Sequence, residues 1–385
     1  MMQKTSLLLT LLTAVTTLAT PLGAASPTAI SFKKIRLDKT FRSEGTGVGD
    51  FNGDGKLDIS AGSVYYAGPD WKMVPIGAKA KQFDPHNYSD SFANFASDVN
   101  RDGRTDLIVV DFPNTPTWWF EQPATQPAEW KRHTGTPVTN NESPQLVDLD
   151  GDGQKELLLA FEPGRKMGVA RPRPDGLWRM HTISEANAPG TDRYSHGLGA
   201  GDLNGDGRTD VLVVEGWWER PVEPDASPWK FHPAKLGGPC AQMYVYDFDD
   251  DGDADVLSSS AHDFGIWWHE QTADGWKTHE IDRSFSQTHS LVMADINGDG
   301  LPDFVTGKRW WAHGPKGDPG ADQPAVMFWF EFSRSAGQPK WTPHKFDDDS
   351  GVGTQFEVAD VNGDSLLDIA TSNKKGTHLF LQERK

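Results

Sequence analysis

Short apolar runs alternate with acidic, glycine-containing turns along most of the chain. Apolar runs at residues 243–246 and 291–294 precede such a turn, and runs at 107–110 and 211–214 follow one. Each run is too short for a helix that packs on a core, and two runs joined by a tight turn are typical of a β-hairpin. The pattern therefore predicts an all-β chain.

The acidic turn occurs seven times with the pattern Asp-x-(Asn/Asp)-x-Asp-x-x-x-(Asp/Glu), followed by an apolar residue. Its first aspartates are Asp50, Asp98, Asp148, Asp202, Asp247, Asp295 and Asp360. The repeats are 45 to 65 residues apart, which is about the length of a four-stranded propeller blade. Five of the repeats also hold a strand with an aromatic pair, such as Trp118-Trp119, and most hold a tryptophan segment such as residues 130–133. We predict a seven-bladed β-propeller of four-stranded blades.

The ends of the chain predict how the ring closes. There are seven acidic turns but only six outer tryptophan segments, which begin at Trp71, Trp130, Trp178, Trp229, Trp276 and Trp341. Residues 31–37 have the pattern of apolar and polar residues expected of the missing outer strand. The last repeat ends after its third strand, near residues 378–382. We expect the N-terminal strand to complete the last blade, which removes an exposed sheet edge. Residues 26–385 then form a single domain.

The first 25 residues have the features of a cleavable signal peptide. A short basic segment precedes an apolar stretch, and small residues end at Ala25. The apolar stretch is too short to span a bilayer, so no membrane insertion is expected. The only cysteine, Cys240, excludes an intramolecular disulfide and lies far from a lipid-anchor position. The predicted location is secreted or periplasmic.

The acidic turns present hard oxygen ligands at alternate positions, with an acid at position nine that closes the loop. This chemistry favours calcium over zinc or copper. We expect up to seven structural calcium ions; in the alternative, some turns hold no ion and are stabilised by their own hydrogen bonds. The predicted ligands are Asp50, Asn52, Asp54, Asp58, Asp98, Asn100, Asp102, Asp106, Asp148, Asp150, Asp152, Glu156, Asp202, Asn204, Asp206, Asp210, Asp247, Asp249, Asp251, Asp255, Asp295, Asn297, Asp299, Asp303, Asp360, Asn362, Asp364 and Asp368.

Two of the turns depart from the pattern, and the seven turns together account for most of the net charge. Arg101 and Ser365 replace glycines, so the second and seventh turns are predicted to bind most weakly. Seven divalent ions would offset most of the net charge of −18, so the excess of acidic residues is explained by their predicted role as metal ligands. Nucleic acid is therefore not an expected partner.

The repeated turn, flanked by strands rather than helices, resembles the FG-GAP (VCBS-type) repeat of integrin-type propellers over residues 31–382. A weaker resemblance, to the propeller part of aldos-2-ulose dehydratases, rests on the order of turn, aromatic strand ending in Glu-x-Pro, and Trp-x-x-His. The first resemblance implies calcium-stabilised blades. The second implies carbohydrate chemistry but transfers no catalytic motif to this chain.

The blade topology places the remaining connections on the face opposite the acidic turns, around the mouth of the central channel, where propellers often bind ligands. Glu44, Glu142, His196 and His289 each stand six residues before a turn, so they are expected at equivalent places. Candidates for ligand binding are Glu44, His86, Tyr88, Glu142, Gln242 and His262. Candidates for catalysis are Arg193, Tyr194, His196, His289, Lys308 and Arg309.

Two functions remain open from the sequence. In the first, the chain binds a glycan or a protein on this face. In the second, it is a carbohydrate lyase or dehydratase in which a His or Tyr acts as the base and an Arg or Lys stabilises the anion. Alternatively, His196, Gln242, His262 and His289 bind a transition metal. Histidines of the outer strands, such as His133, are expected to be structural, and Cys240 is not expected to be a nucleophile. A monomer is predicted.

Overall fold

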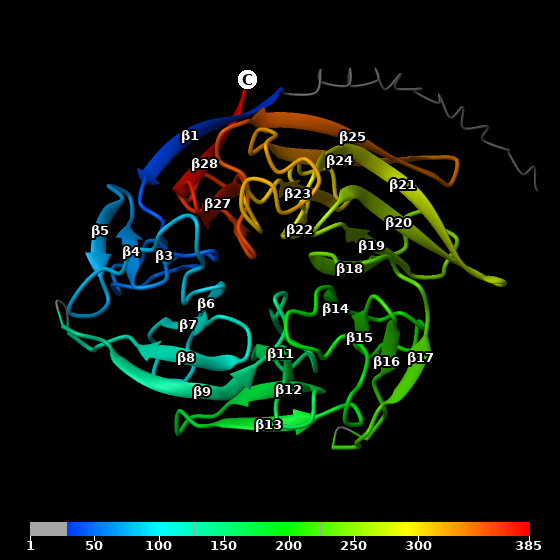
Figure 1. Ribbon diagram of the computed structural model, residues 1–385, viewed down its shortest axis with the longest axis horizontal. Helices are drawn as coiled ribbons and strands as arrows, with labels where there is room; N and C mark the ends of the chain where they lie inside the picture. Colours follow the sequence, from blue (N-terminus) through cyan, green and yellow to red (C-terminus); the bar gives the residue numbers. More distant parts are fainter. Residues whose placement is uncertain (1–28, 126–127, 224) are drawn as a thin grey trace, which may run out of the picture.

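The computed structural model describes residues 29–125, 128–223 and 225–385, so the predicted signal peptide lies outside the described residues. The described residues form strands, turns and bends and contain no helix. No candidate membrane-spanning helix is therefore found among them. Figure 1 shows the strands arranged in sectors around a common centre, with the chain passing from one sector to the next. The predicted all-β class is confirmed, and the fold is a β-propeller.

Most strands pair with their neighbours in sequence, in antiparallel order. The first sheet contains β2 (Val48–Gly49), β3 (Asp58–Ala61), β4 (Val64–Ala67) and β5 (Lys72–Pro75). The next contains β6 (Ala93–Ser97), β7 (Asp106–Val110), β8 (Thr115–Glu121), β9 (Lys131–Thr139), β10 (Gln145–Val147), β11 (Glu156–Phe161), β12 (Lys166–Pro172) and β13 (Trp178–Thr182).

A third sheet contains β14 (Leu198–Gly201), β15 (Asp210–Val213), β16 (Gly216–Glu219), β17 (Lys230–Pro233), β18 (Gln242–Tyr246), β19 (Asp255–Ser259), β20 (Phe264–Thr272) and β21 (Gly275–Ser286). The fourth contains β22 (Leu291–Ala294), β23 (Asp303–Gly307), β24 (Met327–Ser335) and β25 (Gln338–Asp347). The two larger sheets are pairs of four-stranded groups that share only one and two residue pairs, respectively. The third strand of the fourth sheet is β24, which contains the aromatic pair at residues 328–329, whereas the pair at 310–311 lies in the loop before it.

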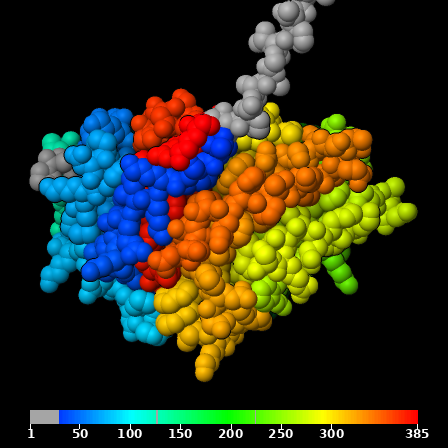
Figure 2. Space-filling view, turned by 90° about the horizontal axis from the view of Figure 1, so that it is seen from above, coloured from blue at the N-terminus to red at the C-terminus, as the bar shows by residue number. Residues whose placement is uncertain are grey.

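The two ends of the described chain meet in one sheet. Its order is β1 (Ile30–Asp38), β28 (Gly376–Arg384), β27 (Asp368–Asn373) and β26 (Glu357–Ala359). Strands β1 and β28 are antiparallel, with Ile30 opposite Arg384. In Figure 2 the blue N-terminal strand lies against the red C-terminal residues and the neighbouring orange segment. The predicted pairing of residues 31–37 with the last strand is present.

Aromatic side chains fill the space between neighbouring sheets. Phe248, Phe304, Phe330 and Phe332 are fully buried and belong to one cluster. Their burial is the main driving force for packing adjacent sheets, at about 25 cal/mol for each Å² of apolar surface removed from water. This core makes the rigid frame on which the loops at the strand ends are held.

Histidines of the outer strands pack on tryptophans of the third strands. The ring centroids of Trp119 and His133 are 4.1 Å apart at an interplanar angle of 9°. Nε2 of His133 lies 2.8 Å from Oε2 of Glu121. Three further histidines each stack on a tryptophan and contact the glutamate equivalent to Glu121. They are His232, His279 and His344. The structural interpretation of these four histidines is confirmed, whereas the ring of His181 lies 6.5 Å from Trp229 without stacking.

Candidate functional site

The first aspartate of each acidic turn organises the turn through backbone hydrogen bonds. In the first turn, Oδ1 of Asp50 accepts from the N–H groups of Gly53 at 2.7 Å and Asp54 at 3.1 Å. Its Oδ2 accepts from Gly55 N–H at 2.8 Å. The same bond to the residue at position six recurs in the other turns. The turns therefore share one backbone geometry.

The acid at position nine has a structural role that the sequence pattern did not reveal. Oδ2 of Asp58 accepts from Phe51 N–H and Oδ1 from Gly68 N–H, both at 2.9 Å. These bonds tie the turn to the end of the third strand, and the other closing aspartates make equivalent ones. Burial raises the pKa of Asp58 to about 7. The assignment of these acids as metal ligands stays a prediction.

Carboxylate oxygens gather most closely in the third and fifth turns. Those of Asp148, Asp150 and Glu156 lie within 4.8 Å of one another, as do those of Asp247, Asp249 and Asp251. One oxygen of Asp150 and one of Asp249 are buried without a hydrogen-bond partner among the described residues. A buried oxygen without a partner is costly unless a cation or water satisfies it. These two turns fit an oxygen-liganded cation such as calcium.

Ser365 in the seventh turn has a left-handed backbone, with φ of 68°, where other turns have glycine. An L-residue in this region costs about 1 kcal/mol relative to glycine. We expect Ser365→Gly to raise the free energy of unfolding by about this amount, measured by denaturant titration. Equal or lower stability of the variant would contradict the predicted strain.

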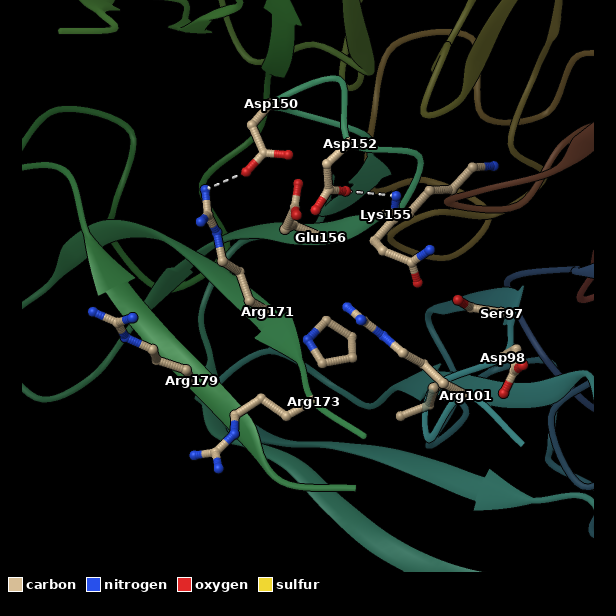
Figure 3. A pocket seen from close by; sticks show the side chains of 13 residues that line it. Ser97, Asp98, Arg101, Asp150, Asp152, Lys155, Glu156, Arg171, Arg173 and Arg179 are labelled. Carbon is tan, nitrogen blue, oxygen red and sulfur yellow. Dashed lines mark hydrogen bonds and ion pairs between the residues drawn. The ribbon is translucent and has the colours of Figure 1, made fainter. Parts of the chain in front are cut away.

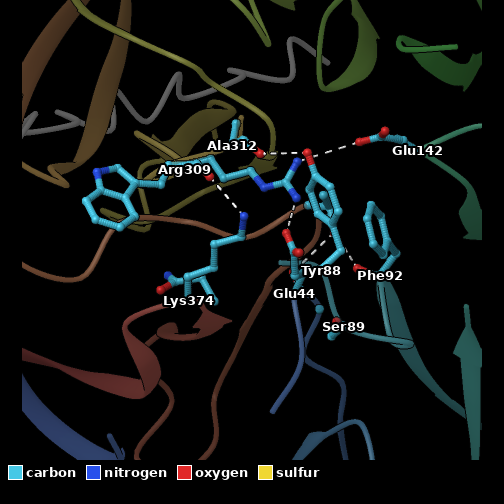
Figure 4. Close-up of polar contacts among 12 residues, drawn as sticks. Glu44, Tyr88, Ser89, Phe92, Glu142, Arg309, Ala312 and Lys374 are labelled. Carbon is cyan, nitrogen blue, oxygen red and sulfur yellow. Dashed lines mark hydrogen bonds and ion pairs between the residues drawn. The ribbon is translucent and has the colours of Figure 1, made fainter. Parts of the chain in front are cut away.

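At the other end of the inner strands, loops from several sheets bring charged side chains together. Glu44 precedes β2, whereas Asp50 follows it, so the two residues lie at opposite ends of one strand. The Arg309 guanidinium, which follows β23, contacts Glu44 and lies 3.6 Å from Oε2 of Glu142. Figure 4 shows Arg309 between the two glutamates. All three side chains are almost fully buried.

Three histidines lie beside this group. The ring centroids of His196 and His262 are 4.6 Å apart, those of His262 and His289 are 4.9 Å apart, and His196 and His289 are 5.4 Å apart. One ring nitrogen of each lies within 4.8 Å of the others. His196 is oriented by a 2.7 Å contact between Nδ1 and the carbonyl oxygen of Tyr194, which leaves Nε2 facing Glu142 at 3.5 Å. We call these three residues the histidine triad.

The triad has the features of a metal site. Nε2 of His196, Nδ1 of His262 and both ring nitrogens of His289 are buried without a hydrogen-bond partner among the described residues. Zinc binds imidazole nitrogen at about 2.0–2.1 Å, so side-chain shifts of about 1 Å would bring three nitrogens onto one ion. A backbone carbonyl on the second ring nitrogen, as at His196, is a common support for a metal ligand.

Burial and nearby charges hold the site in a defined protonation state. Burial, followed by repulsion from His196, lowers the pKa of His262 to about 4, and burial also lowers the pKa of His289. Burial alone would raise the pKa of Glu142, but its contacts with His196 and Arg309 outweigh burial and lower it. His262 and His289 are therefore neutral near pH 7, which is the form that binds metals, and Glu142 is ionised, which is the form that accepts a proton.

Lys374 and Tyr88 border the site. Nζ of Lys374 donates to the carbonyl oxygen of Trp311 at 2.9 Å and lies 4.5 Å from the centroid of the Tyr88 ring. Burial lowers the pKa of Lys374 to about 8. The Tyr88 hydroxyl donates to the carbonyl oxygen of Ala312 at 3.0 Å. Tyr88 is 37% exposed, so part of its ring remains open to solvent.

Several other predicted site residues have different contacts. The Tyr194 and Arg193 side chains pack on Phe112. Lys308 donates to Ser286 and to the carbonyl oxygen of Gly320, so it supports the insertion at residues 313–325 rather than the cluster of Arg309.

His86 and Gln242 also lie outside the Arg309 cluster. His86 is exposed and contacts Asp84. Gln242 contacts Ser290 and the carbonyl oxygen of Thr354, not the triad. Among the described residues, neither side chain forms a hydrogen bond or ion pair with the triad, so neither has a role there.

The insertion adds two residues that the sequence analysis missed. The His313 ring stacks on His262 with centroids 4.7 Å apart, and its Nδ1 lies 3.0 Å from Oδ2 of Asp318. Oδ1 of Asp318 also lies 3.6 Å from Nδ1 of His262. The insertion belongs to no repeat, so repeat comparison had no equivalent position by which to find these residues. The contact with His262 places the insertion on the side of the molecule that carries the triad.

Cys240 lies in an apolar cluster with Leu212 and Met243 and is fully buried. Burial raises the pKa of its thiol to about 12, so almost no thiolate forms at pH 8. We expect no reaction with a thiol reagent in the native state and complete reaction after unfolding in guanidinium. Rapid labelling of the folded protein would contradict this prediction.

Comparisons with known proteins concern the repeats and the fold. Residues 98–159 and 247–306 match the model of the FG-GAP-like repeat. No curated protein matches the chain in sequence. Similar solved structures include a protein from Lactobacillus plantarum, with a TM-score of 0.50 and 8% identity over 82% of this chain and 87% of that chain.

Two further structures align less well. An Agrocybe aegerita lectin described as recognising non-reducing terminal N-acetylglucosamine has a TM-score of 0.46 and 14% identity, over 92% of this chain and 86% of the lectin chain. Rhamnogalacturonan lyase YesW has a TM-score of 0.46 and 13% identity, over 92% of this chain and 76% of the lyase chain. At this level of similarity neither alignment bears on ligand or activity.

Proposed function

Because this chain is a β-propeller with FG-GAP-like repeats, we propose that it has seven blades, that β1 closes the ring, and that calcium stabilises the acidic turns. The proposal includes export of the protein through its N-terminal segment. The pairing of β1 with β28 supports closure, and the buried oxygens of Asp150 and Asp249 support cation binding. The functional face is then the one that carries Arg309 and the histidine triad.

We further propose that this face is the active site of a metal-assisted lyase or dehydratase acting on a carbohydrate. The observation that carries the proposal is the histidine triad, in which buried imidazole nitrogens converge without partners beside an ionised glutamate. By contrast, the four outer-strand histidines that stack on tryptophan, such as His133, each have a hydrogen-bond partner. His378 is also buried with both ring nitrogens unpartnered, but it belongs to no group of three metal-ligating residues among those described. Perturbed titratable groups in one cluster are typical of catalytic sites.

The residues divide into roles for β-elimination. A transition metal held by His196, His262 and His289 would supply a Lewis acid for a substrate carbonyl or carboxylate oxygen. Glu142 accepts the proton from the adjacent carbon, and the electrons of that C–H bond form the new double bond as the neighbouring C–O bond breaks. The Lys374 ammonium donates the proton that the leaving oxygen takes up. Arg309 is a positioning residue, because it fixes Glu142 from a fully buried place.

The substrate class follows from the groups around the triad. The part-exposed ring of Tyr88 offers an apolar face, while Glu142 and Lys374 offer an acceptor and a donor nearby. A sugar has both an apolar ring face and hydroxyl groups, and a uronic acid or keto-sugar also has the acidic C–H bond that elimination requires. These features favour uronate polysaccharides and keto-sugars as substrates.

Glu142→Gln is the direct test of the proposed base. The amide has nearly the same shape but cannot take up the proton, so we expect kcat to fall by at least about 100-fold. Unsaturated products from a panel of uronate polysaccharides and keto-sugars would be followed by their absorbance, with bound metal measured in parallel. Unchanged kcat in a variant that retains its metal would overturn the role of Glu142, and failure of every substrate would overturn the lyase proposal.

A binding function is the second candidate, and one observation favours it. Tyr88, Phe112 and Tyr194 form a row of rings, with neighbouring centroids 5.5 and 5.7 Å apart, and both tyrosines are exposed by more than a third. Exposed tyrosines offer rigid apolar faces to ligands at low entropic cost. A glycan array would show binding that Tyr194→Ala abolishes and Glu142→Gln leaves intact. The reverse pattern would favour the enzyme.

A further inference from the structure

A second charged site lies among the acidic turns, away from the histidine triad. A cavity of about 320 Å³ between the second and third turns is lined by five basic residues. They are Arg101, Lys155, Arg171, Arg173 and Arg179. Figure 3 shows Arg101 coming from the second turn and the other three arginines from the β12–β13 hairpin. We call this cavity the arginine pocket.

Each acidic residue of the arginine pocket has at least one hydrogen-bond or ion-pair partner. Asp98 accepts from the N–H groups of Asp102 at 2.9 Å and Gly103 at 2.8 Å. Asp150 pairs with Arg171 at 3.0 Å. Glu156 accepts from Leu149 N–H at 3.0 Å. Asp152 accepts from Gln154 N–H at 2.7 Å, and Oδ1 of Asp150 is left for the proposed calcium ion of the third turn. Figure 3 shows the Arg101 side chain pointing toward the β12–β13 hairpin.

The basic groups are much less well satisfied. Arg101 and Lys155 have no ion-pair partner within 4 Å among the described residues, and Nε of Arg171 is buried without a hydrogen-bond partner there. Arg173 and Arg179 pair with Asp175 and Asp225 on the exposed surface, where such pairs contribute little. The lining therefore holds five basic residues against four acidic ones, on a chain whose net charge is −18.

Arg101 adds an independent argument from the backbone. Its φ is 60°, and five of the other turns have glycine at the same position. A bulky L-residue in the left-handed region costs about 1–2 kcal/mol relative to glycine. The strained position is therefore occupied by the residue that brings a guanidinium to the arginine pocket.

We propose that the arginine pocket binds an oxyanion, namely the carboxylate, sulfate or phosphate group of a ligand no larger than an oligosaccharide end. Guanidinium groups bind such anions through paired N–H donors with matching geometry. The pocket lining contains no aromatic residue on which a nucleobase or a neutral sugar ring could stack. Charge recognition by Arg101, Arg171, Arg173 and Arg179 is therefore the expected mode of binding.

Arg101→Gly separates binding from stability, because it removes a cation and a backbone strain together. We expect its affinity for a galacturonate trimer to fall by at least about tenfold while its melting temperature stays equal or rises. Ser365→Gly is the matched control, since it relieves the same backbone conformation in the seventh turn, outside the pocket. It should stabilise the protein and leave the affinity unchanged.

Titration calorimetry at saturating calcium would compare the galacturonate trimer, inorganic sulfate, glucose 6-phosphate and a neutral galactose trimer. The anions should bind, with affinity falling as salt rises, and the neutral trimer should not. The order of the three anions identifies the source of the oxyanion. Full affinity in Arg101→Gly, equal binding of the neutral trimer, or no anion binding would overturn the proposal. His289→Ala should bind the anion normally, so the outcome is independent of the proposed catalytic site.

Discussion

The double replacement His196→Ala/His289→Ala is expected to remove bound transition metal and to abolish turnover, while leaving the metal-free protein folded. Two of the three imidazoles are lost, and a single histidine cannot hold the ion. Stability of the metal-free protein should fall only modestly, because the ring nitrogens of His289 and Nε2 of His196 have no hydrogen-bond partners, and only Nδ1 of His196 loses one, the carbonyl oxygen of Tyr194. Metal content would be measured by mass spectrometry after loading with zinc, and melting temperatures compared after chelation.

His133→Ala is the control for this prediction, because His133 stacks on Trp119 in an outer strand and is not part of the triad. It should keep its metal content and activity, with a modest loss of stability from the lost stacking. A metal content in the double variant equal to that of the unmodified protein would exclude the triad as the metal site. A large fall in its metal-free melting temperature would instead assign His196 and His289 a structural role.

The repeat carries most of the information about the fold. Its spacing predicts where each pair of inner strands lies, and the mismatch between acidic turns and tryptophan segments predicts the pairing of β1 with β28. These predictions work because most blades repeat the same order of apolar strand, acidic turn and aromatic strand. Where the repeat is interrupted, between β23 and β24, two aromatic pairs, at residues 310–311 and 328–329, fit the pattern of the third strand, and only the structure shows which of them forms it.

The candidate site could be predicted only in part. Glu44, Glu142, His196 and His289 share one position relative to their turns, so topology brings them to one mouth. Which of them touch depends on the side-chain contacts of Arg309, which no repeat position specifies. Tyr194 and Lys308 lie in equally suitable loops, yet Tyr194 packs on Phe112 and Lys308 supports the insertion. Loop conformation, rather than blade topology, decides these outcomes.

Removal of calcium is expected to lower the melting temperature by more than about 10 °C at pH 7.5 and by much less at pH 5.5. Several sites, each contributing about 2–3 kcal/mol at calcium concentrations near 100 times the Kd, would together give a fall of this size. The dependence on pH follows from the closing carboxyls. Burial raises the pKa of Asp58, Asp106, Asp255 and Asp303 to about 7 in the metal-free protein, above the ordinary value of 3.8.

The sign of this effect is defined by proton binding. Between pH 4 and pH 7 the metal-free folded state holds more protons on these acids than the unfolded state does, so its stability falls as pH rises. Calcium needs the ionised carboxylates, so its affinity and its stabilisation increase over the same range. Calorimetric melting with and without chelator at both pH values measures the difference, and Asp150→Asn should reduce it at the third turn. Equal melting temperatures with and without chelator at pH 7.5 would exclude calcium as the source of stability, and the buried oxygens of Asp150 and Asp249 would then need another partner.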